Sequence, residues 1–244
     1  MLTFGSLFAG IGGIDLGLER AGMICKWQVE IDPFRRQVLA KHWPDVERFG
    51  DVKDVGKHNL AAVDLIAGGF PCQDISTANQ NAEGLQGERS GLWSEFARII
   101  GELGPRWVLV ENVKRLLSIN DGRDFGTVLK DLARCGYDAT WQVLRASDVG
   151  AFHRRERVFL IANRDSKRIK GFWNEPLSQQ PTFSWCQDVR GPTDLRGRSD
   201  IPEPLVCRSG DGFPAAVDAI GNAVVPQVAE WIGRRIVEVE NGRT

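Results

Sequence analysis

Cysteine is scarce in this sequence, and its spacing argues against both a disulfide framework and a zinc site. Five Cys residues are spread over 244 positions, and none of them belongs to a C-x-x-C pair. An odd, scattered set of this kind is typical neither of a disulfide framework nor of a zinc site. We therefore expect a protein without structural disulfides and without a bound metal.

Long hydrophobic runs and a leader are missing as well. No apolar stretch approaches the roughly 18 residues that a membrane-spanning helix needs. The first residues, Met1 to Ser6, lack the basic start of a signal peptide. These absences predict a cytoplasmic protein that does not contact a membrane.

The chain also has almost no excess of charge of either sign. Its formal net charge is −1, and 26% of its residues are charged against 42% that are hydrophobic, which excludes a disordered chain. The charge is unevenly distributed, because residues 151–200 hold ten Lys or Arg against six Asp or Glu. This basic stretch is either a solvated surface or a contact for an anionic partner.

Short apolar runs alternate with amphipathic stretches over the first two thirds of the chain. The alternation predicts an α/β fold, in which a doubly wound, mostly parallel sheet carries helices on both faces. Asp32 is expected to cap the second helix, in which Pro33 takes the first position. Strands are expected over residues 2–8, 24–31, 63–67, 107–110, 139–145 and 157–162, and helices over 14–21, 33–43, 92–103, 125–135 and 226–239.

A glycine-rich loop follows the first expected strand. It reads Phe8-Ala9-Gly10-Ile11-Gly12-Gly13 and opens a helix, so its glycines and free N–H groups suit a closely approaching ligand. Asp15 stands where a dinucleotide fingerprint would have its third glycine. Glu30 ends the second expected strand, where a carboxylate typically binds ribose hydroxyls. The pattern predicts a nucleoside-containing ligand, with a plain tight turn as the alternative.

A second loop carries the most reactive side chain of the sequence. Cys72 lies in Gly69-Phe70-Pro71-Cys72-Gln73, directly after an expected buried strand. Ligands of α/β sheets bind beyond the carboxyl ends of their strands, and a thiolate there is a strong nucleophile. A lone cysteine would more often be a core residue, so the interpretation depends on the neighbouring motifs.

Five motifs follow one another along the chain. They are Phe8-x-Gly10-x-Gly12, Gly69-Phe70-Pro71-Cys72-Gln73, Glu111-Asn112-Val113, Arg155-Glu156-Arg157 and Gly221-Asn222-Ala223-Val224-Val225-Pro226. In this order they resemble the motifs of the cytosine carbon-5 DNA methyltransferases, and the likeness covers residues 2–162 and 218–235. The resemblance implies a Rossmann-like methyltransferase fold and transfer of a methyl group from S-adenosylmethionine to carbon 5 of cytosine in duplex DNA.

The resemblance assigns catalytic roles to four side chains. Cys72 would attack carbon 6 of a cytosine that has flipped out of the duplex, which makes carbon 5 nucleophilic. Glu111, expected at the end of a strand, would donate a proton to ring nitrogen 3, which requires a raised pKa. Arg155 and Arg157 would supply fixed positive donors.

The same resemblance implies a binding site for S-adenosylmethionine. Glu30 would hold the ribose, Asp51 and Val52 would face the adenine, and the C-terminal motif would close the site. The full set of expected cofactor-binding residues is Phe8, Ala9, Gly10, Ile11, Gly12, Gly13, Glu30, Ile31, Asp51, Val52, Pro71, Leu92, Asn222 and Val224.

DNA recognition is expected from a short segment between two parts of the catalytic fold. Residues 1–164 would form the catalytic domain, 165–213 an irregular target-recognition segment with the aromatic pairs Phe172-Trp173 and Phe183-Trp185, and 214–244 the returning C-terminal motif. A segment this short predicts a site of about four base pairs or fewer. The expected DNA-binding residues are Gln73, Ser76, His153 (where the family usually has Gln), Arg190, Arg196 and Arg198.

The main expectation is a monomeric DNA methyltransferase that accompanies a cognate restriction endonuclease. Three alternatives to this function stay open. The first is a tRNA cytosine methyltransferase, although that branch usually has Pro-Pro-Cys-Gln where this chain has Phe70-Pro71-Cys72-Gln73. The second is a Rossmann oxidoreductase, against which the missing third glycine counts. The third is an inactive DNA-binding module, against which the complete set of Cys72, Glu111 and Arg155 counts.

Overall fold

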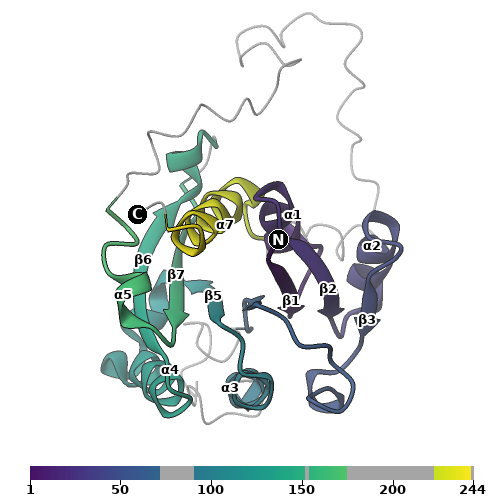
Figure 1. The fold of residues 1–244 in the computed structure, drawn as a ribbon, viewed down its shortest axis with the longest axis horizontal. Helices are drawn as coiled ribbons and strands as arrows, with labels where there is room; N and C mark the ends of the chain where they lie inside the picture. Colours follow the sequence, from purple (N-terminus) through teal and green to yellow (C-terminus); the bar gives the residue numbers. More distant parts are fainter. Residues whose placement is uncertain (72–90, 152–153, 175–222, 243–244) are drawn as a thin grey trace, which may run out of the picture.

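The computed structural model describes residues 1–71, 91–151, 154–174 and 223–242. In this part of the chain a seven-stranded sheet runs through the molecule (Figure 1). Its strands are β1 (Thr3–Leu7), β2 (Ile24–Val29), β3 (Glu47–Phe49), β4 (Leu65–Gly68), β5 (Trp107–Val113), β6 (Asp138–Arg145) and β7 (Glu156–Asn163). The α-helices are α1 (Gly13–Arg20), α2 (Pro33–His42), α3 (Gly91–Leu103), α4 (Arg123–Arg134), α5 (Ser166–Ile169) and α7 (Pro226–Glu240).

The strands lie in the order β3-β2-β1-β4-β5-β7-β6, and every described pairing is parallel except those of β7. The order reverses between β1 and β4, because the chain builds outward from β1 on one side and from β4 on the other. In doubly wound sheets this reversal opens a crevice at the carboxyl ends of the two strands. The loops after β1 and β4 are therefore the ones placed to bind a ligand.

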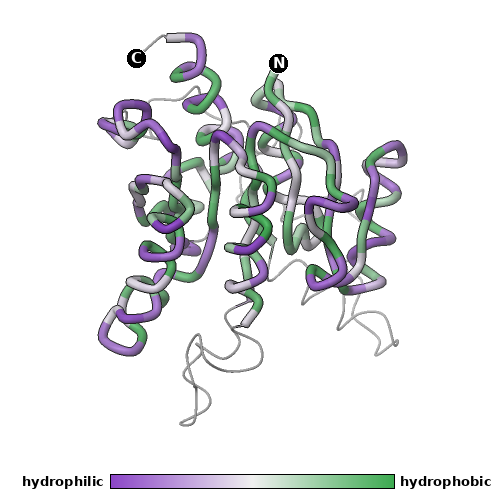
Figure 2. The backbone as a smooth tube through the Cα atoms, turned by 60° about the horizontal axis from the view of Figure 1, so that its bottom comes forward, coloured by the Kyte–Doolittle hydropathy of each residue, from purple (hydrophilic) through white to green (hydrophobic). Residues whose placement is uncertain are grey.

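Helices cover both faces of the sheet, as predicted. One apolar cluster joins α3 and α4 to the sheet through residues such as Phe96, Ile100 and Val128. The other joins α1 and α7 to the opposite face through residues such as Leu18, Ala229 and Ile232. Hydrophobic residues gather along the inner strands, while hydrophilic residues are frequent on the outer helices (Figure 2).

Most predicted elements agree with the structure within a few residues, but strands β3 and β5 and the short helix α5 differ. Helix α5 lies in the segment predicted to be irregular, because its four residues are too few for a helical period to show. The three-residue strand β3 was not predicted, because it is too short for a hydrophobic alternation to show. Strand β5 was expected to end at Val110 but continues to Val113, because the antiparallel neighbour β7 pairs with it as far as Val113. Asp32 caps α2 as predicted and accepts a hydrogen bond from the Arg35 N–H at 2.9 Å.

The first residues of the predicted recognition segment belong to the core. Phe172 is 1% exposed and packs against Trp107, and Trp173 stacks on Trp231 of α7 with ring centroids 5.9 Å apart. Phe172 and Trp173 therefore contribute to the packing of the catalytic fold. The second aromatic pair and the boundary at 213 lie outside the described residues, and the division into domains stays a prediction.

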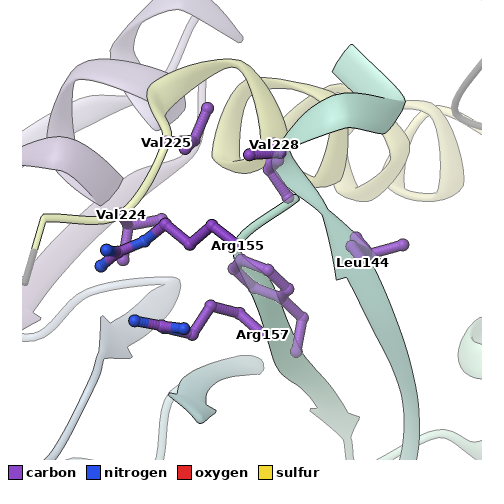
Figure 3. Close-up of a pocket in the computed structure, with 8 residues that line it drawn as sticks. Leu144, Arg155, Arg157, Val224, Val225 and Val228 are labelled. Carbon is purple, nitrogen blue, oxygen red and sulfur yellow. The ribbon is translucent and has the colours of Figure 1, made fainter. Parts of the chain in front are cut away.

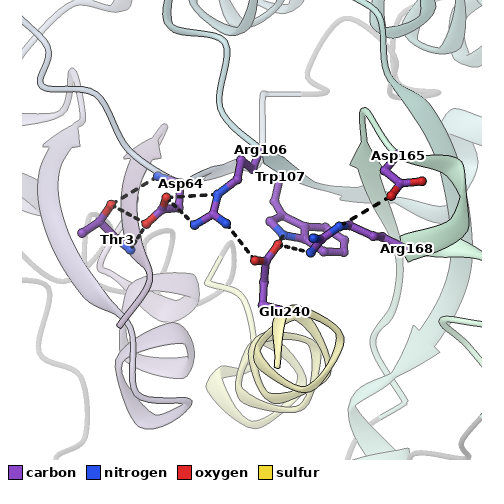
Figure 4. A network of polar contacts seen from close by, with 7 residues as sticks. All are labelled: Thr3, Asp64, Arg106, Trp107, Asp165, Arg168 and Glu240. Carbon is purple, nitrogen blue, oxygen red and sulfur yellow. Dashed lines mark hydrogen bonds and ion pairs between the residues drawn. The ribbon is translucent and has the colours of Figure 1, made fainter. Parts of the chain in front are cut away.

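The C-terminal end of helix α7 is hydrogen-bonded to residues at the amino-terminal edge of the sheet (Figure 4). Glu240 accepts hydrogen bonds from Arg106 at 2.8 Å, from the Trp107 indole at 2.8 Å and from Arg168 at 2.6 Å. Arg106 also bonds Asp64, which in turn accepts the N–H of Thr3 at the start of β1. This network fixes where α7 lies, and thereby where its first residues meet the loop after β1.

Candidate functional site

The glycine loop after β1 is held in a conformation that ordinary side chains rarely adopt. Gly10 and Gly12 have φ values of +60° and +86°, and a side chain on Gly12 would collide with Trp43. A Cβ on Gly10 would meet no atom of the described residues within 4 Å, so these residues leave room beside this part of the loop. Phe8 also has a positive φ of 53° and stacks on Phe96, which anchors the start of the loop.

Glu30 lies beside this loop and shapes it. Its carboxylate is 5% exposed and accepts hydrogen bonds from the Gly10 N–H at 2.7 Å and the Asp32 N–H at 2.9 Å. The loop after β1 and the turn after β2 are thus joined through one acidic side chain. The neighbouring Ile31 is 65% exposed, which leaves a large apolar side chain facing solvent at the same edge.

Three further predicted cofactor residues border the same edge. Asp51 is half-buried and caps a short helical turn by accepting the Lys53 N–H at 3.0 Å. Val52 is 3% exposed and belongs to the core. Leu92, in the first turn of α3, packs against the core from a half-buried position. Their predicted contacts with a cofactor stay predictions.

The C-terminal segment closes over the start of α1. A Cβ on Gly13 would lie 2.3 Å from the carbonyl oxygen of Val224, and one on Gly17 would lie 2.4 Å from that of Pro226. Glycine is required at both positions because the two backbones approach so closely. The structure therefore brings Val224, predicted from the last motif, directly against the glycine loop; Asn222 lies outside the described residues.

The loop after β4 is pressed against the end of β5. The Asn112 amide donates a hydrogen bond to the Phe70 carbonyl at 3.2 Å. A Cβ on Gly69 would lie 2.6 Å from Oε2 of Glu111, so only glycine fits there. Pro71 is the last described residue of this loop. Sequence analysis named Asn112 only as part of a motif, and its bond to the loop became visible only once β4 and β5 were paired.

Glu111 is a buried carboxyl group between this loop and β7. It is 8% exposed, and its Oε1 lies 3.0 Å from Nε of Arg157. Burial raises the pKa of Glu111 to about 7, although the nearby Arg157 and Arg155 act in the opposite direction. A carboxyl group with such a pKa exchanges a proton near neutral pH, which suits a general acid.

Arg155 and Arg157 present their guanidinium groups to one side of β7, and that of Arg155 lies close to Val224 (Figure 3). They line a small pocket together with apolar residues of β6, β7 and the start of α7. Arg155 has a φ of 25°, an unusual backbone conformation of the kind found at functional sites. Glu156 points elsewhere and accepts bonds from Lys114 at 2.9 Å and Arg145 at 3.0 Å.

The structure thus brings together residues from separate stretches of sequence, around the edge where the strand order reverses. Glu30, Glu111, Arg157 and Val224 all line this edge or the pocket beside it. Several predicted residues lie outside the described part of the chain, and their roles stay predictions. These are Cys72, Gln73, Ser76, His153, Arg190, Arg196, Arg198 and Asn222.

Two negative findings apply to the described residues alone. None of their helices combines the length and the apolar character that crossing a membrane requires. Their His, Cys, Asp and Glu side chains form no group of three or more that could hold a metal ion.

Comparison with known proteins gives one consistent result. Residues 2–195 match the model of the C-5 cytosine-specific DNA methylase family. The chain is 38% identical over 232 residues to the type II methyltransferase M2.BsuMI of Bacillus subtilis, covering 87% of this chain and 58% of that protein. It is 32% identical over 171 residues to M.HhaI of Haemophilus parahaemolyticus, covering 70% and 52%. The chain spans about half the length of the curated relatives it matches.

Solved structures show the same fold. One is a protein described as a DNA modification methyltransferase encoded within an Escherichia coli prophage, with a TM-score of 0.58, 30% identity, and coverage of 70% of this chain and 48% of that one. Another is the DNMT2 of Spodoptera frugiperda, with a TM-score of 0.57, 20% identity, and coverage of 68% and 51%. The sheet order, the ordered motifs and the family match lead to one conclusion: the chain belongs to the C-5 cytosine-specific DNA methylase family.

Proposed function

We propose that this chain transfers a methyl group from S-adenosylmethionine to carbon 5 of cytosine in duplex DNA. The observation that carries the proposal is the buried Glu111, whose pKa of about 7 allows it to protonate a base. It lies between Arg157 of β7 and the loop that leads to Cys72. A family relationship alone would leave the chemistry open, whereas this arrangement supports one particular reaction.

The residues around the glycine loop fit S-adenosylmethionine. The described residues leave room beside Gly10, and the buried Glu30 carboxylate next to it is suited to accept hydrogen bonds from the two ribose hydroxyls. The exposed Ile31 offers an apolar surface for the adenine ring. Bound S-adenosylmethionine would supply the methyl group that carbon 5 of the base receives.

The chain's own side chains would carry the remaining steps. The Cys72 thiolate adds to carbon 6 of the flipped-out cytosine, while Glu111 delivers a proton to nitrogen 3 and so neutralises the ring. Carbon 5 is then electron-rich and takes up the methyl group. Water takes the proton from carbon 5, the proton on nitrogen 3 returns to Glu111, and the Cys72 thiolate leaves carbon 6, which restores the neutral aromatic base and the starting state of both side chains. Arg155 and Arg157 would stabilise the charge that develops on the base.

Two features support the assignment of Cys72 as nucleophile. The first is its place in the sequence, two residues after Phe70, whose carbonyl accepts a hydrogen bond from Asn112, and three after Gly69, which packs against Glu111. The second is the position of the other cysteines. The two cysteines that the structure describes are poor candidates by contrast. Cys25 is buried beneath α1, where burial raises the pKa of its thiol, and Cys135 lies at the far end of α4.

A labelled methyl-transfer assay tests the proposal. The purified chain is incubated with radiolabelled S-adenosylmethionine and either unmethylated duplex DNA or tRNA. Label should enter DNA as 5-methylcytosine, Cys72→Ala should lose at least about a thousandfold in rate, and the matched control Cys135→Ala should stay within about twofold of wild type. Label in tRNA alone, label in neither substrate, or an active Cys72→Ala variant would overturn the proposal.

A further inference from the structure

Beneath the glycine loop lies a carboxylate that the proposed mechanism does not use. Asp15, in the first turn of α1, is completely buried. It accepts hydrogen bonds from the Ser6 hydroxyl at 3.1 Å and the Gln28 amide at 2.9 Å, and the Cys25 sulfur lies 3.8 Å away. All three partners are neutral, so none of them compensates the charge of the carboxylate.

The local backbone is arranged to produce this cluster. An irregularity in the pairing of β1 with β2 places Phe4 opposite Cys25 but the next residue, Gly5, opposite Trp27. The extra residue in β2 brings the Cys25 and Gln28 side chains to the same face of the sheet, where both reach Asp15. Ser6 extends from the same face of β1.

Burying a charge without a counterion is unfavourable, and the pKa of Asp15 reflects this. Burial raises the pKa of Asp15 to about 6, while the bonds from Gln28 and Ser6 oppose the rise. The one other charged group that acts on it, Glu19 of α1, is negative and adds to the rise. On α7, which packs on α1, the buried Glu230 is already paired with Arg234. Asp15 therefore remains negative at neutral pH, with no cation facing it among the described residues.

The position of Asp15 relates this charge to the proposed cofactor site. It is two residues past Gly13, or about 3 Å further along the helix axis. Its partner Ser6 is two residues before Phe8, and its partner Gln28 is two residues before Glu30. Each residue of the cluster is therefore close in sequence to a residue of the ligand-binding edge. A positive charge on a ligand at this edge would interact favourably with Asp15 through the poorly screening interior.

We propose that Asp15 is a specificity-determining residue that favours the positively charged S-adenosylmethionine over its uncharged-sulfur product, S-adenosylhomocysteine. The inference rests on the proposed function. The two molecules share adenine, ribose and amino-acid groups and differ in one methyl group and in the charge at sulfur. A fixed negative charge below the site acts on that difference, and so helps the product to leave once the methyl group has been transferred.

Calorimetric affinities for the two compounds test this inference. Asp15→Asn keeps the shape of the side chain, and Gln28 Oε1, which has no hydrogen-bond partner, can accept a bond from the new amide. The ratio of the two dissociation constants should shift against S-adenosylmethionine by about three- to tenfold. The melting temperature should stay equal or rise, because an uncompensated buried charge is removed. A purely structural role would instead weaken both compounds equally and lower the melting temperature.

Asp124→Asn is the matched control. Asp124 is also a buried aspartate in the first turn of a helix, bonded to a neutral amide, but it lies in α4, away from the glycine loop. The control should leave the affinity ratio unchanged. An unchanged ratio in Asp15→Asn, or an equal shift in the control, would overturn the inference.

A second measurement uses the unaltered chain and does not depend on a variant that folds. The preference for S-adenosylmethionine over S-adenosylhomocysteine should decline as the pH falls through about 6, because Asp15 then becomes neutral. A preference that stays constant between pH 5 and 8 would overturn the inference. Failure of the wild type to bind either compound would instead reject the proposed function itself.

Discussion

Glu111 is the residue on which the proposed chemistry most depends, and its burial makes a prediction about stability. Its pKa is raised from 4.5 to about 7 in the folded chain, chiefly by burial. The folded state therefore keeps a proton that the unfolded state releases, so this group reduces stability as pH rises from about 4.5 to 7. Glu111→Gln should remove that dependence, and its advantage over wild type at pH 7.5 should reach up to about 3 kcal/mol.

Urea unfolding at several pH values measures this effect, and the transfer assay gives the companion result. The same variant should lose most of its methyl-transfer activity, because an amide cannot donate the proton. A wild type and a variant with parallel stability profiles would show that Glu111 does not hold the proton in the folded chain.

Glu30 permits a separate prediction about the cofactor. Removing its carboxylate abolishes the hydrogen bonds from the Gly10 and Asp32 N–H groups. It also removes the oxygens that would accept hydrogen bonds from the ribose hydroxyls. Because hydrogen bonds to charged groups contribute about 1.5–3 kcal/mol each, Glu30→Ala should weaken S-adenosylmethionine binding by at least tenfold. Calorimetry measures the affinity, with Glu47→Ala as the control, because Glu47 is the exposed first residue of strand β3. An unchanged affinity for Glu30→Ala would contradict the assignment.

At this scale the sequence motifs were enough to single out candidate residues but not their partners. Glu30, Glu111 and Val224 come from three different motifs, and their roles stay predictions. The pairing of Glu111 with Arg157 could not be foreseen from spacing, because it depends on which strand lies beside β5. Asp15 was noted only as the residue in place of a glycine, since a single sequence does not reveal that a carboxylate is buried.

Among the secondary-structure elements, the contact between α1 and the C-terminal segment is one that substitution should disturb. Gly13→Ala would place a methyl group 2.3 Å from the Val224 carbonyl oxygen, so the two segments would have to separate. We expect a lower melting temperature and at least tenfold weaker cofactor binding. The matched control is Gly126→Ala in α4, whose added methyl group meets nothing within 4 Å.

The control should change in the opposite direction. Alanine is favoured over glycine inside a helix by about 1 kcal/mol, so Gly126→Ala should be slightly stabilised. Thermal unfolding and calorimetry on both variants decide the matter. Equal behaviour of the two variants would mean that the close approach of α1 and residue 224 has no role in the cofactor site.

The network around Glu240 predicts a loss of stability from the opposite end of α7 (Figure 4). Glu240→Ala removes three hydrogen bonds and leaves the buried Trp107 indole N–H without its acceptor. We expect a loss of about 1–3 kcal/mol in the free energy of unfolding, measured in urea. Asp121→Ala is the control, because its ion pair with Arg123 is almost fully exposed and should contribute little. Equal stabilities of the two variants would contradict this account of α7.

Strands and helices were predictable wherever hydrophobic periodicity extends over several residues. Helices α3 and α7 were predicted to within one residue at each end, because their apolar residues recur at helical spacing. Strand β3 has only three residues, and the end of β5 depends on pairing with a strand that follows much later in the sequence. Local patterns carry no information on such pairings.

Across the whole molecule, the sheet order explains why distant motifs meet. Strand β7 inserts antiparallel between β5 and β6, which places Arg155 and Arg157 next to Glu111. The reversal between β1 and β4 places the glycine loop beside the loop that precedes Cys72. A strand–helix alternation predicted the parallel part of this sheet, but the insertion of β7 is a long-range feature that only the folded chain reveals.

The central claim is that Cys72 bonds covalently to a cytosine of duplex DNA. Duplex DNA synthesised with 5-fluorocytosine in place of cytosine tests it most directly, because after methyl transfer carbon 5 carries fluorine instead of a removable proton and the adduct cannot break down. With S-adenosylmethionine present, denaturing electrophoresis should show a stable protein–DNA complex, and peptide mass spectrometry should locate the bond at Cys72. Absence of a complex, or a bond at any other residue, would contradict the account.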